Sequence, residues 1–208
     1  MLLDNVQFSK RGFQHRTQYS TKSGNKYLSL PVKSKGVQCE NTKIKDILIA
    51  DEKKIKKHYT TLCHRYSKTP GWPLIKDKID HIYSEKHKTL VEINQALLDL
   101  TLTCYQVSTP VIRASELKVE GNKSELILSI LKNVNANIYL SGNGARRYMD
   151  HSLFADANIT IRYQKFEHPQ YDQNLNTSFS PACFALEWFL LDPMKSVKHF
   201  KNVSSDEY

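Results

Sequence analysis

The chain has 208 residues, of which 40% are hydrophobic and 25% are charged, proportions typical of ordinary globular proteins. This composition excludes an intrinsically disordered chain, and the longest apolar runs are too short to span a bilayer. The segment after Met1 meets Asp4, Gln7 and Lys10 before an apolar signal region develops. We therefore expect a cytoplasmic protein without a membrane span.

Thirty basic residues against twenty-one acidic ones give a formal net charge of +9, and the excess is concentrated in 43–57 and 76–88. A positive field favours anionic partners, although a solvated basic helix face explains the same pattern. RNA binding is the last-ranked hypothesis, because these stretches lack the exposed aromatic platforms on which single strands stack. We expect nucleic acid not to be a partner.

Cysteine and histidine spacing gives no sign of a metal centre. The four cysteines never form a Cys-x-x-Cys pair, which favours reduced structural thiols over zinc or disulfides. Five histidines lack metal-ligand spacing and are expected at the surface or in packing: His64, His81, His87, His151 and His199. We expect no metal and no cofactor.

Two strands are predicted near the beginning of the chain. Residues 2–8 form the first, a polar connection covers 9–16, and residues 27–32 form the second, which Pro31 closes. A turn is expected at 23–25, between the strands.

Three helices are predicted next, and together they make a helical insertion over 51–108. The first starts with Asp51 as its N-cap and ends before the Pro70-Gly71 pair. The second covers 73–83. The third and longest covers 85–104, with apolar residues at spacings of three and four.

The order strand, helix, strand across 109–141 predicts a right-handed parallel βαβ unit. Its strands are 109–115 and 137–140, and its helix begins at a capping-box-like pair, Asn122 and Glu125.

Residues 159–166 alternate as an edge strand does, and 181–191 form a closing helix. The predicted fold is one α/β domain over residues 1–208, Rossmann-like and layered, with a parallel sheet at its core.

Glycines and arginines follow the predicted strand 137–140, where open α/β folds bind ligands. We expect this loop to bind an anionic substrate through Ser141, Gly142, Asn143, Gly144 and Arg146. An α-helix starting near Ala145 would add free N–H groups, and the arginines a fork for phosphate. A tight turn with solvated arginines is the alternative, and a third glycine is missing, which excludes a standard NAD site.

Arg113, Ser115 and Glu116 follow another predicted strand and are second-rank candidates for the same crevice, although Arg113 and Glu116 could instead form a structural ion pair. His168 is the histidine chosen for proton transfer, with Glu167 to orient it. Adjacent strand residues point to opposite faces, so this pair requires the strand to have ended before it.

The opening segment carries Gln7, Lys10 and Arg11, which suit a phosphate or nucleotide, and Gln14, His15 and Arg16 extend the set. An exposed basic connection is the alternative for all of them.

Five segments carry a resemblance to the WbqC-like protein family: 4–8, 28–32, 110–117, 141–150 and 166–171. The resemblance implies a role in bacterial surface-polysaccharide or O-antigen synthesis, as an acyl or aminoacyl (for example glycyl) transferase. Its expected acceptor is a nucleotide-linked or phosphorylated amino sugar. The alternative is a non-catalytic or truncated ligand-binding module of a polysaccharide assembly system.

The chain departs from the family in two places. Family members usually carry a further N-terminal strand and a His-Gln-Pro segment, so we expect a truncated N-terminus that lacks the first strand. Where the family has a small hydroxyl residue and an aspartate, this chain has Phe184 and Glu187.

Overall fold

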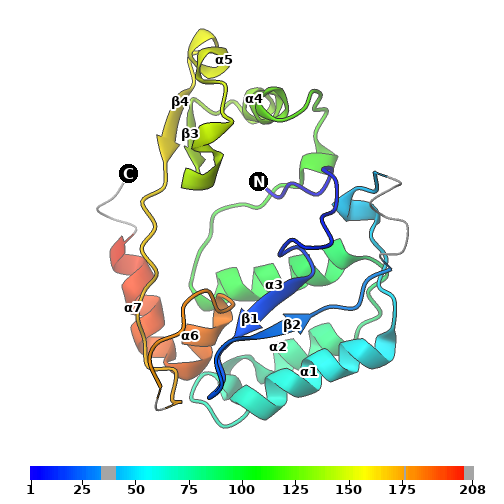
Figure 1. Ribbon diagram of the computed structural model, residues 1–208, viewed down its shortest axis with the longest axis vertical. Coiled ribbons are helices and arrows are strands. Elements are labelled where there is room, and N and C mark those ends of the chain that lie inside the picture. Colours follow the sequence, from blue (N-terminus) through cyan, green and yellow to red (C-terminus); the bar gives the residue numbers. More distant parts are fainter. Residues whose placement is uncertain (34–40, 176, 204–208) are drawn as a thin grey trace. The chain divides into compact units, whose positions relative to one another are not determined.

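The computed structural model describes residues 1–33, 41–175 and 177–203 (Figure 1). For residues 202 and 203 it describes the backbone alone. The chain divides into two compact units. Unit 1 comprises Met1–Asn5 and Val111–His168, and unit 2 comprises Val6–Pro110 and Pro169–Tyr208. The expectation of one domain over the whole chain stays a prediction.

Unit 2 begins with an antiparallel hairpin of β1 (Arg16–Tyr19) and β2 (Lys26–Ser29), in which Arg16 lies opposite Ser29. Thr21 and Gly24 exchange backbone hydrogen bonds of 3.2 and 3.0 Å. Gly24 has a φ of +97°, which a residue with a side chain rarely adopts. The turn predicted at 23–25 is confirmed, and the strand predicted over 27–32 is confirmed in part.

The strand predicted over 2–8 is wrong. Leu2 forms a single bridge with Arg113, whereas Gln7 forms one with Lys43. The segment therefore passes from unit 1 to unit 2 between these two bridges, and neither partner continues long enough to build a ladder.

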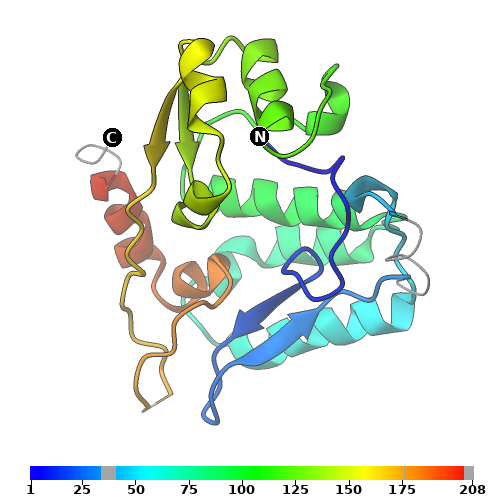
Figure 2. The same cartoon turned by 45° about the horizontal axis from the view of Figure 1, so that its top comes forward.

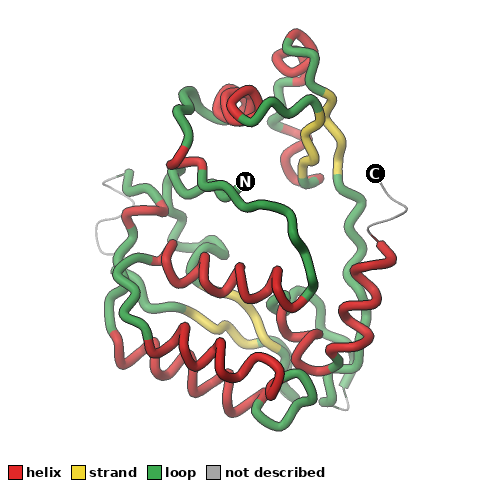
Figure 3. The backbone as a smooth tube through the Cα atoms, turned by 180° about the vertical axis from the view of Figure 1, so that it is seen from behind, coloured by secondary structure: helices red, strands yellow, loops and turns green. Residues whose placement is uncertain are grey.

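Three helices form the frame of unit 2: α1 (Glu52–Tyr66), α2 (Trp72–Ser84) and α3 (Leu90–Cys104). The Asp51 side chain accepts a hydrogen bond from Lys53 N and caps α1, as predicted. Helix α3 begins five residues later than predicted, because Thr89 and Glu92 form a capping box that fixes its first turn. Figures 1 and 3 show α1 and α2 side by side, with the hairpin beside them.

The closing helix predicted over 181–191 is shorter, and α6 (Leu186–Leu191) is followed by α7 (Pro193–Val203). The loop before α2 packs tightly on α6, since Gly71 N donates to Leu190 O at 2.9 Å. A Cβ at Gly71 would lie 2.3 Å from Phe189 O, so no larger residue fits.

Unit 1 holds α4 (Ser124–Asn133), β3 (Ile138–Ser141), α5 (His151–Asp156) and β4 (Thr160–Tyr163). Strands β3 and β4 pair in parallel, side by side in Figure 2. A small core of Leu128, Leu131, Phe154 and Ile159 lies within the unit.

The predicted parallel unit is displaced along the chain. The parallel connection runs from β3 to β4, whereas 109–115 contains no strand and turns into the short 3-10 helix η2 (Ala114–Glu116). Two further 3-10 helices are η1 (Ile44–Asp46) and η3 (Asn143–Arg147).

The fold is thus mixed α/β, as predicted. Within the described residues each of the two sheets has two strands, so a layered Rossmann-like core is not confirmed. None of the helices in the described ranges combines the length and the hydrophobicity needed to cross a membrane.

Candidate functional site

A partly open cavity of about 270 Å³ is formed by unit 2, and we call it the unit 2 cavity. The hairpin, α1, α2, α3 and residues 184–190 each contribute to its wall. Most of this wall is apolar, and its aliphatic side chains are Leu28, Leu30, Leu62, Ile79, Leu97, Leu98, Leu186 and Leu190. A concave apolar space with a few polar groups is typical of a small-molecule site.

His58 on α1 is the titratable side chain buried deepest in the wall of the cavity. Its Nδ1 lies 2.7 Å from the hydroxyl oxygen of Tyr83 on α2. Burial lowers the pKa of His58 to about 4, so the ring is neutral at pH 7. Within the described residues Nε2 has no hydrogen-bond partner, and either tautomer satisfies Nδ1. The imidazole can therefore offer Nε2 as a donor or as an acceptor to a ligand.

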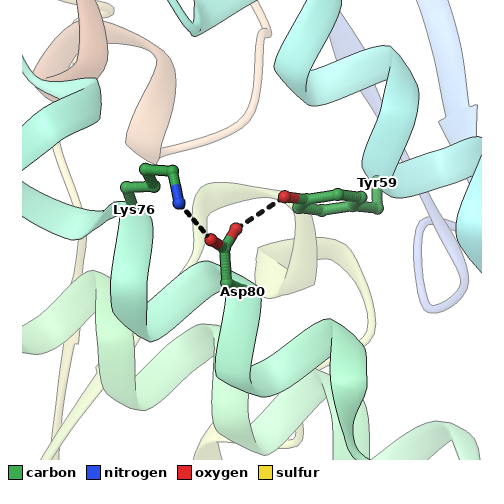
Figure 4. A network of polar contacts seen from close by, with 3 residues as sticks. All are labelled: Tyr59, Lys76 and Asp80. Atoms are coloured by element: carbon green, nitrogen blue, oxygen red, sulfur yellow. Dashed lines mark hydrogen bonds and ion pairs between the residues drawn. The ribbon is translucent and has the colours of Figure 1, made fainter.

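A network of polar contacts formed by Tyr59, Lys76 and Asp80 joins α1 to α2 (Figure 4). The hydroxyl of Tyr59 donates to Asp80 Oδ1 at 2.6 Å, and Lys76 Nζ lies 2.5 Å from Asp80 Oδ2. Hydrogen bonds from Lys76 and then Tyr59 lower the pKa of Asp80. The hydrogen bond from Tyr59 to Asp80 thus joins α1 to α2 one residue after His58.

Asn94 and Thr101 on α3 also line the cavity. The Asn94 side chain donates to Gln14 O at 2.8 Å, which ties α3 to the loop before the hairpin. Its side-chain oxygen has no partner within the described residues. Thr101 donates to Leu97 O at 2.7 Å and retains free acceptor capacity.

His15 and Arg16 lie at the hairpin side of the cavity. His15 Nδ1 and Arg16 Nε are buried without a hydrogen-bond partner among the described residues. Desolvation, followed by the charge of Arg16, lowers the pKa of His15. The Arg16 guanidinium lies 4.5 Å from the centroid of the exposed Tyr27 ring, so its charge is on the outer face of the hairpin.

A buried carboxylate stands behind the cavity wall. Glu187 on α6 is 0% exposed, and its Oε1 accepts from Ser20 N at 3.0 Å, Ser20 Oγ at 2.8 Å and the Tyr66 hydroxyl at 2.5 Å. Oε2 accepts from the Tyr171 hydroxyl at 3.0 Å and Gln173 Nε2 at 3.2 Å. Burial by itself would raise the pKa of Glu187, but these donors lower it. The carboxylate is therefore a saturated structural anion.

Gln7, Lys10 and Arg11 are all exposed in unit 2, and the backbone carbonyl of Arg11 accepts from the Arg16 guanidinium at 2.6 Å. None of these three lines the cavity. Gln14, His15 and Arg16, which extend this set along the chain, do line the cavity.

The predicted substrate loop lies in unit 1. Ser141 is buried at the end of β3, whereas Gly142, Asn143, Gly144 and Arg146 are exposed. A Cβ at Gly142 or Gly144 would meet nothing within 4 Å. The α-helix predicted from Ala145 is wrong, because residues 143–147 form the 3-10 helix η3 and α5 starts at His151, capped by Asp150. The dipole of a long helix is therefore missing at this loop.

The groups around η2 are arranged by Asp4, which is buried. Its Oδ1 accepts from Ser115 N at 2.9 Å and its Oδ2 from Ser115 Oγ at 2.6 Å. Within the described chain no ion pair joins the side chains of Arg113 and Glu116, which are linked through Glu116 N and Arg113 O at 3.1 Å.

Glu167 and His168 follow β4, which ends at Tyr163. The geometric requirement for their pairing, that the strand has already ended, is thus met. Glu167 is exposed and His168 is half-buried, with its ring centroid 5.9 Å from that of Phe166. Their catalytic role stays a prediction.

Sequence reasoning missed His58, Tyr83 and Asn94. A signal was present for His58, because it lies three residues after Ile55 and four before Leu62, on the apolar stripe of α1. A histidine on such a stripe is buried and is either structural or functional. Tyr83 and Asn94 carry no comparable local signal.

Metal and thiol chemistry find little support within the described residues. No group of three or more His, Cys, Asp or Glu side chains there is placed to hold a metal ion. Cys63, Cys104 and Cys183 are free thiols, and Cys39 lies outside the described residues. Burial raises the pKa of Cys104 to about 11 and also raises the pKa of Cys183, so both remain protonated at pH 7.

Comparison with known proteins gives a family. The chain is similar to an uncharacterized protein of Mycobacterium tuberculosis, Rv1507c, at 26% identity over 188 residues, which cover 90% of this chain and 80% of that protein. No solved structure matches it. The family model described as the WbqC-like protein family matches residues 1–198. The chain therefore belongs to the WbqC-like protein family.

Proposed function

We propose that this protein is a transferase of bacterial surface-polysaccharide synthesis, which moves an acyl or aminoacyl group onto a nucleotide-linked amino sugar. The observation that carries the proposal is the unit 2 cavity, in which the neutral ring of His58 borders an apolar space. Membership of the WbqC-like family supports the biological setting. The cytoplasmic location expected from the sequence belongs to this proposal as well.

The cavity suits the acyl side of the reaction. The sugar amine attacks the carbonyl carbon of the donor, a C–N bond forms, the bond to the donor's leaving group breaks, and the amine loses a proton. A neutral imidazole can accept that proton directly, whereas a charged one cannot. His58 is always deprotonated at pH 7, although its pKa of about 4 makes it a weak base.

The nucleotide side rests on the residues predicted from sequence. Gln7, Lys10 and Arg11 in unit 2 are exposed groups of the kind that bind phosphate. The loop of unit 1, with Arg146 beside Gly142 and Gly144, is an alternative phosphate site. Arg113, Ser115 and Glu116 stay second-rank candidates in unit 1, and His168 with Glu167 is the alternative to His58 as the base.

A non-catalytic ligand-binding module is the second candidate function. It is favoured by the protonated state of Cys104 and Cys183, which leaves no activated thiolate there to carry an acyl intermediate. Direct transfer between two bound substrates needs no such intermediate, so the transferase stays the first candidate.

Mass spectrometry of the sugar tests the transferase. UDP-glucosamine incubated with the protein and a set of acyl thioesters should gain one acyl group as an amide, and UDP-N-acetylglucosamine, whose nitrogen is already acylated, should not. His58→Gln should slow the transfer by about a hundredfold or more if His58 is the base.

The control is His64→Gln, because His64 is exposed on the same helix and outside the cavity. His168→Gln separates the two candidate bases. Binding of UDP-glucosamine without any acyl transfer would favour the binding module. If the folded protein neither binds UDP-glucosamine nor acylates it, both functions are rejected.

A further inference from the structure

Charged groups are distributed unevenly around the unit 2 cavity. Among its lining residues there is no aspartate, glutamate or lysine. Arg16 is the lining residue with a fixed charge, and its guanidinium lies over the exposed Tyr27 ring and donates to Arg11 O. The interior of the cavity therefore presents neutral hydrogen-bonding groups and apolar walls.

Glu187 cannot supply the missing negative charge. It does not line the cavity, and its two oxygens already accept hydrogen bonds from Ser20, Tyr66, Tyr171 and Gln173. A carboxylate that is saturated in this way has no free lone pair to offer a ligand.

We propose that the unit 2 cavity binds an uncharged, largely apolar acyl group and rejects an aminoacyl group that carries an ammonium. An ammonium bound in the cavity would lose part of its hydration without an anion on the wall to pair with, which weakens binding. The inference rests on the proposed function and decides its acyl against its aminoacyl form.

The polar groups that remain fit a carbonyl or amide. His58 Nε2 and the Asn94 side-chain oxygen are without partners among the described residues, and they come from α1 and α3. Leu97 and Leu98 supply apolar surface beside them. A short branched chain that ends in a neutral carbonyl group satisfies both parts of this lining.

A matched pair of ligands tests the proposal. Isocaproamide and leucinamide share a carbon skeleton and differ in the α-ammonium, which is charged at about pH 6. Each is titrated into the full chain, and binding is followed by two-dimensional amide NMR. Isocaproamide should bind about tenfold or more tightly than leucinamide, because only the latter brings an unpaired charge.

Two threonines on α3 provide the variants. Thr101 lines the cavity and Thr103 is exposed, yet both donate to the carbonyl four residues earlier, at 2.7 and 2.8 Å. Thr101→Leu should abolish isocaproamide binding by filling the cavity, and Thr103→Leu should leave it unchanged. Leu97→Phe is a second filling variant, for use if Thr101→Leu does not fold.

A third variant should reverse the preference. Asn94→Asp puts a carboxylate on the wall in place of an amide of the same shape, so leucinamide should then bind more tightly than isocaproamide. Equal or tighter binding of leucinamide by the unchanged protein would overturn the proposal. So would the absence of isocaproamide binding, or its persistence in both filling variants.

These outcomes are separate from those of the transfer reaction, because no sugar is present. Isocaproamide binding without acylation of UDP-glucosamine would leave the cavity assignment standing and reject the transferase. Transfer of a glycyl group to the sugar, together with leucinamide binding, would keep the transferase and reject this inference.

Discussion

The two units hold their candidate groups by different means. In unit 2, His58 and Glu187 are buried and are linked to neighbouring elements by hydrogen bonds with tyrosines. In unit 1, the loop with Gly142, Gly144 and Arg146 is exposed, and its glycines have open space around them. Substitutions at these groups in unit 2 should therefore change stability and function together, whereas substitutions in the unit 1 loop should change function with only a small change in stability.

The largest effect is expected from Glu187→Ala. The substitution leaves Ser20, Tyr66, Tyr171 and Gln173 without their shared acceptor in the interior, so unit 2 should lose about 3–5 kcal/mol of stability. Urea unfolding followed by tryptophan fluorescence measures this unit, since both tryptophans, Trp72 and Trp188, belong to it.

Asp77→Asn is the control, because Asp77 is an exposed carboxylate on α2 of the same unit. It should change the unfolding free energy by no more than about 0.5 kcal/mol. A loss below about 1 kcal/mol in Glu187→Ala would mean that water replaces the carboxylate, and the contrast between the units would weaken.

The next effect is a pH dependence that comes from His58. Burial lowers its pKa from 6.5 to about 4, so between these values the unfolded chain takes up a proton that the folded chain does not. The contribution of the neutral ring is complete above pH 6.5 and is lost as the pH falls toward 4, by about 3 kcal/mol in all.

His58→Asn should flatten that part of the profile, as measured by urea unfolding at a series of pH values. His64→Asn should keep the slope of the unchanged protein, because the His64 side chain is exposed on the same helix. Parallel profiles for His58→Asn and the unchanged protein would show that other groups, such as His15, cause the acid sensitivity.

Local signals were sufficient for two helices of unit 2, α1 and α2. Asp51 caps α1, and the Pro70-Gly71 pair separates α1 from α2, because these preferences act over one helical turn. Strands were less predictable, since a strand exists only where a partner lies beside it. Residues 109–115 have the composition of a strand, but Ala114–Glu116 turn away, and β4 takes the place beside β3.

The substrate-binding residues named from the sequence stay predictions, and most of the residues that line the unit 2 cavity were not among them. Gln14, His15 and Arg16 followed from their place after the opening segment, and they line the cavity. His58 and Asn94 come from two helices that are distant in sequence, and no local spacing announces that they share a cavity. Folding creates that site, so only the burial of His58 on an apolar stripe could have hinted at it.

The smallest effect on stability is expected in unit 1, from Arg146→Gln. The Arg146 guanidinium lies 4.9 Å from the centroid of the Tyr163 ring, and a cation–π contact at an exposed site contributes about 0.5–1 kcal/mol.

If the loop binds the diphosphate of a nucleotide sugar, Arg146→Gln should weaken the binding of UDP-glucosamine about tenfold in calorimetric titration. Arg162→Gln, which removes an exposed charge from the adjoining strand β4, should not. Equal affinities of the two variants would assign the arginines to the solvated surface, and unit 2 would then hold the remaining phosphate-binding candidates, Lys10 and Arg11.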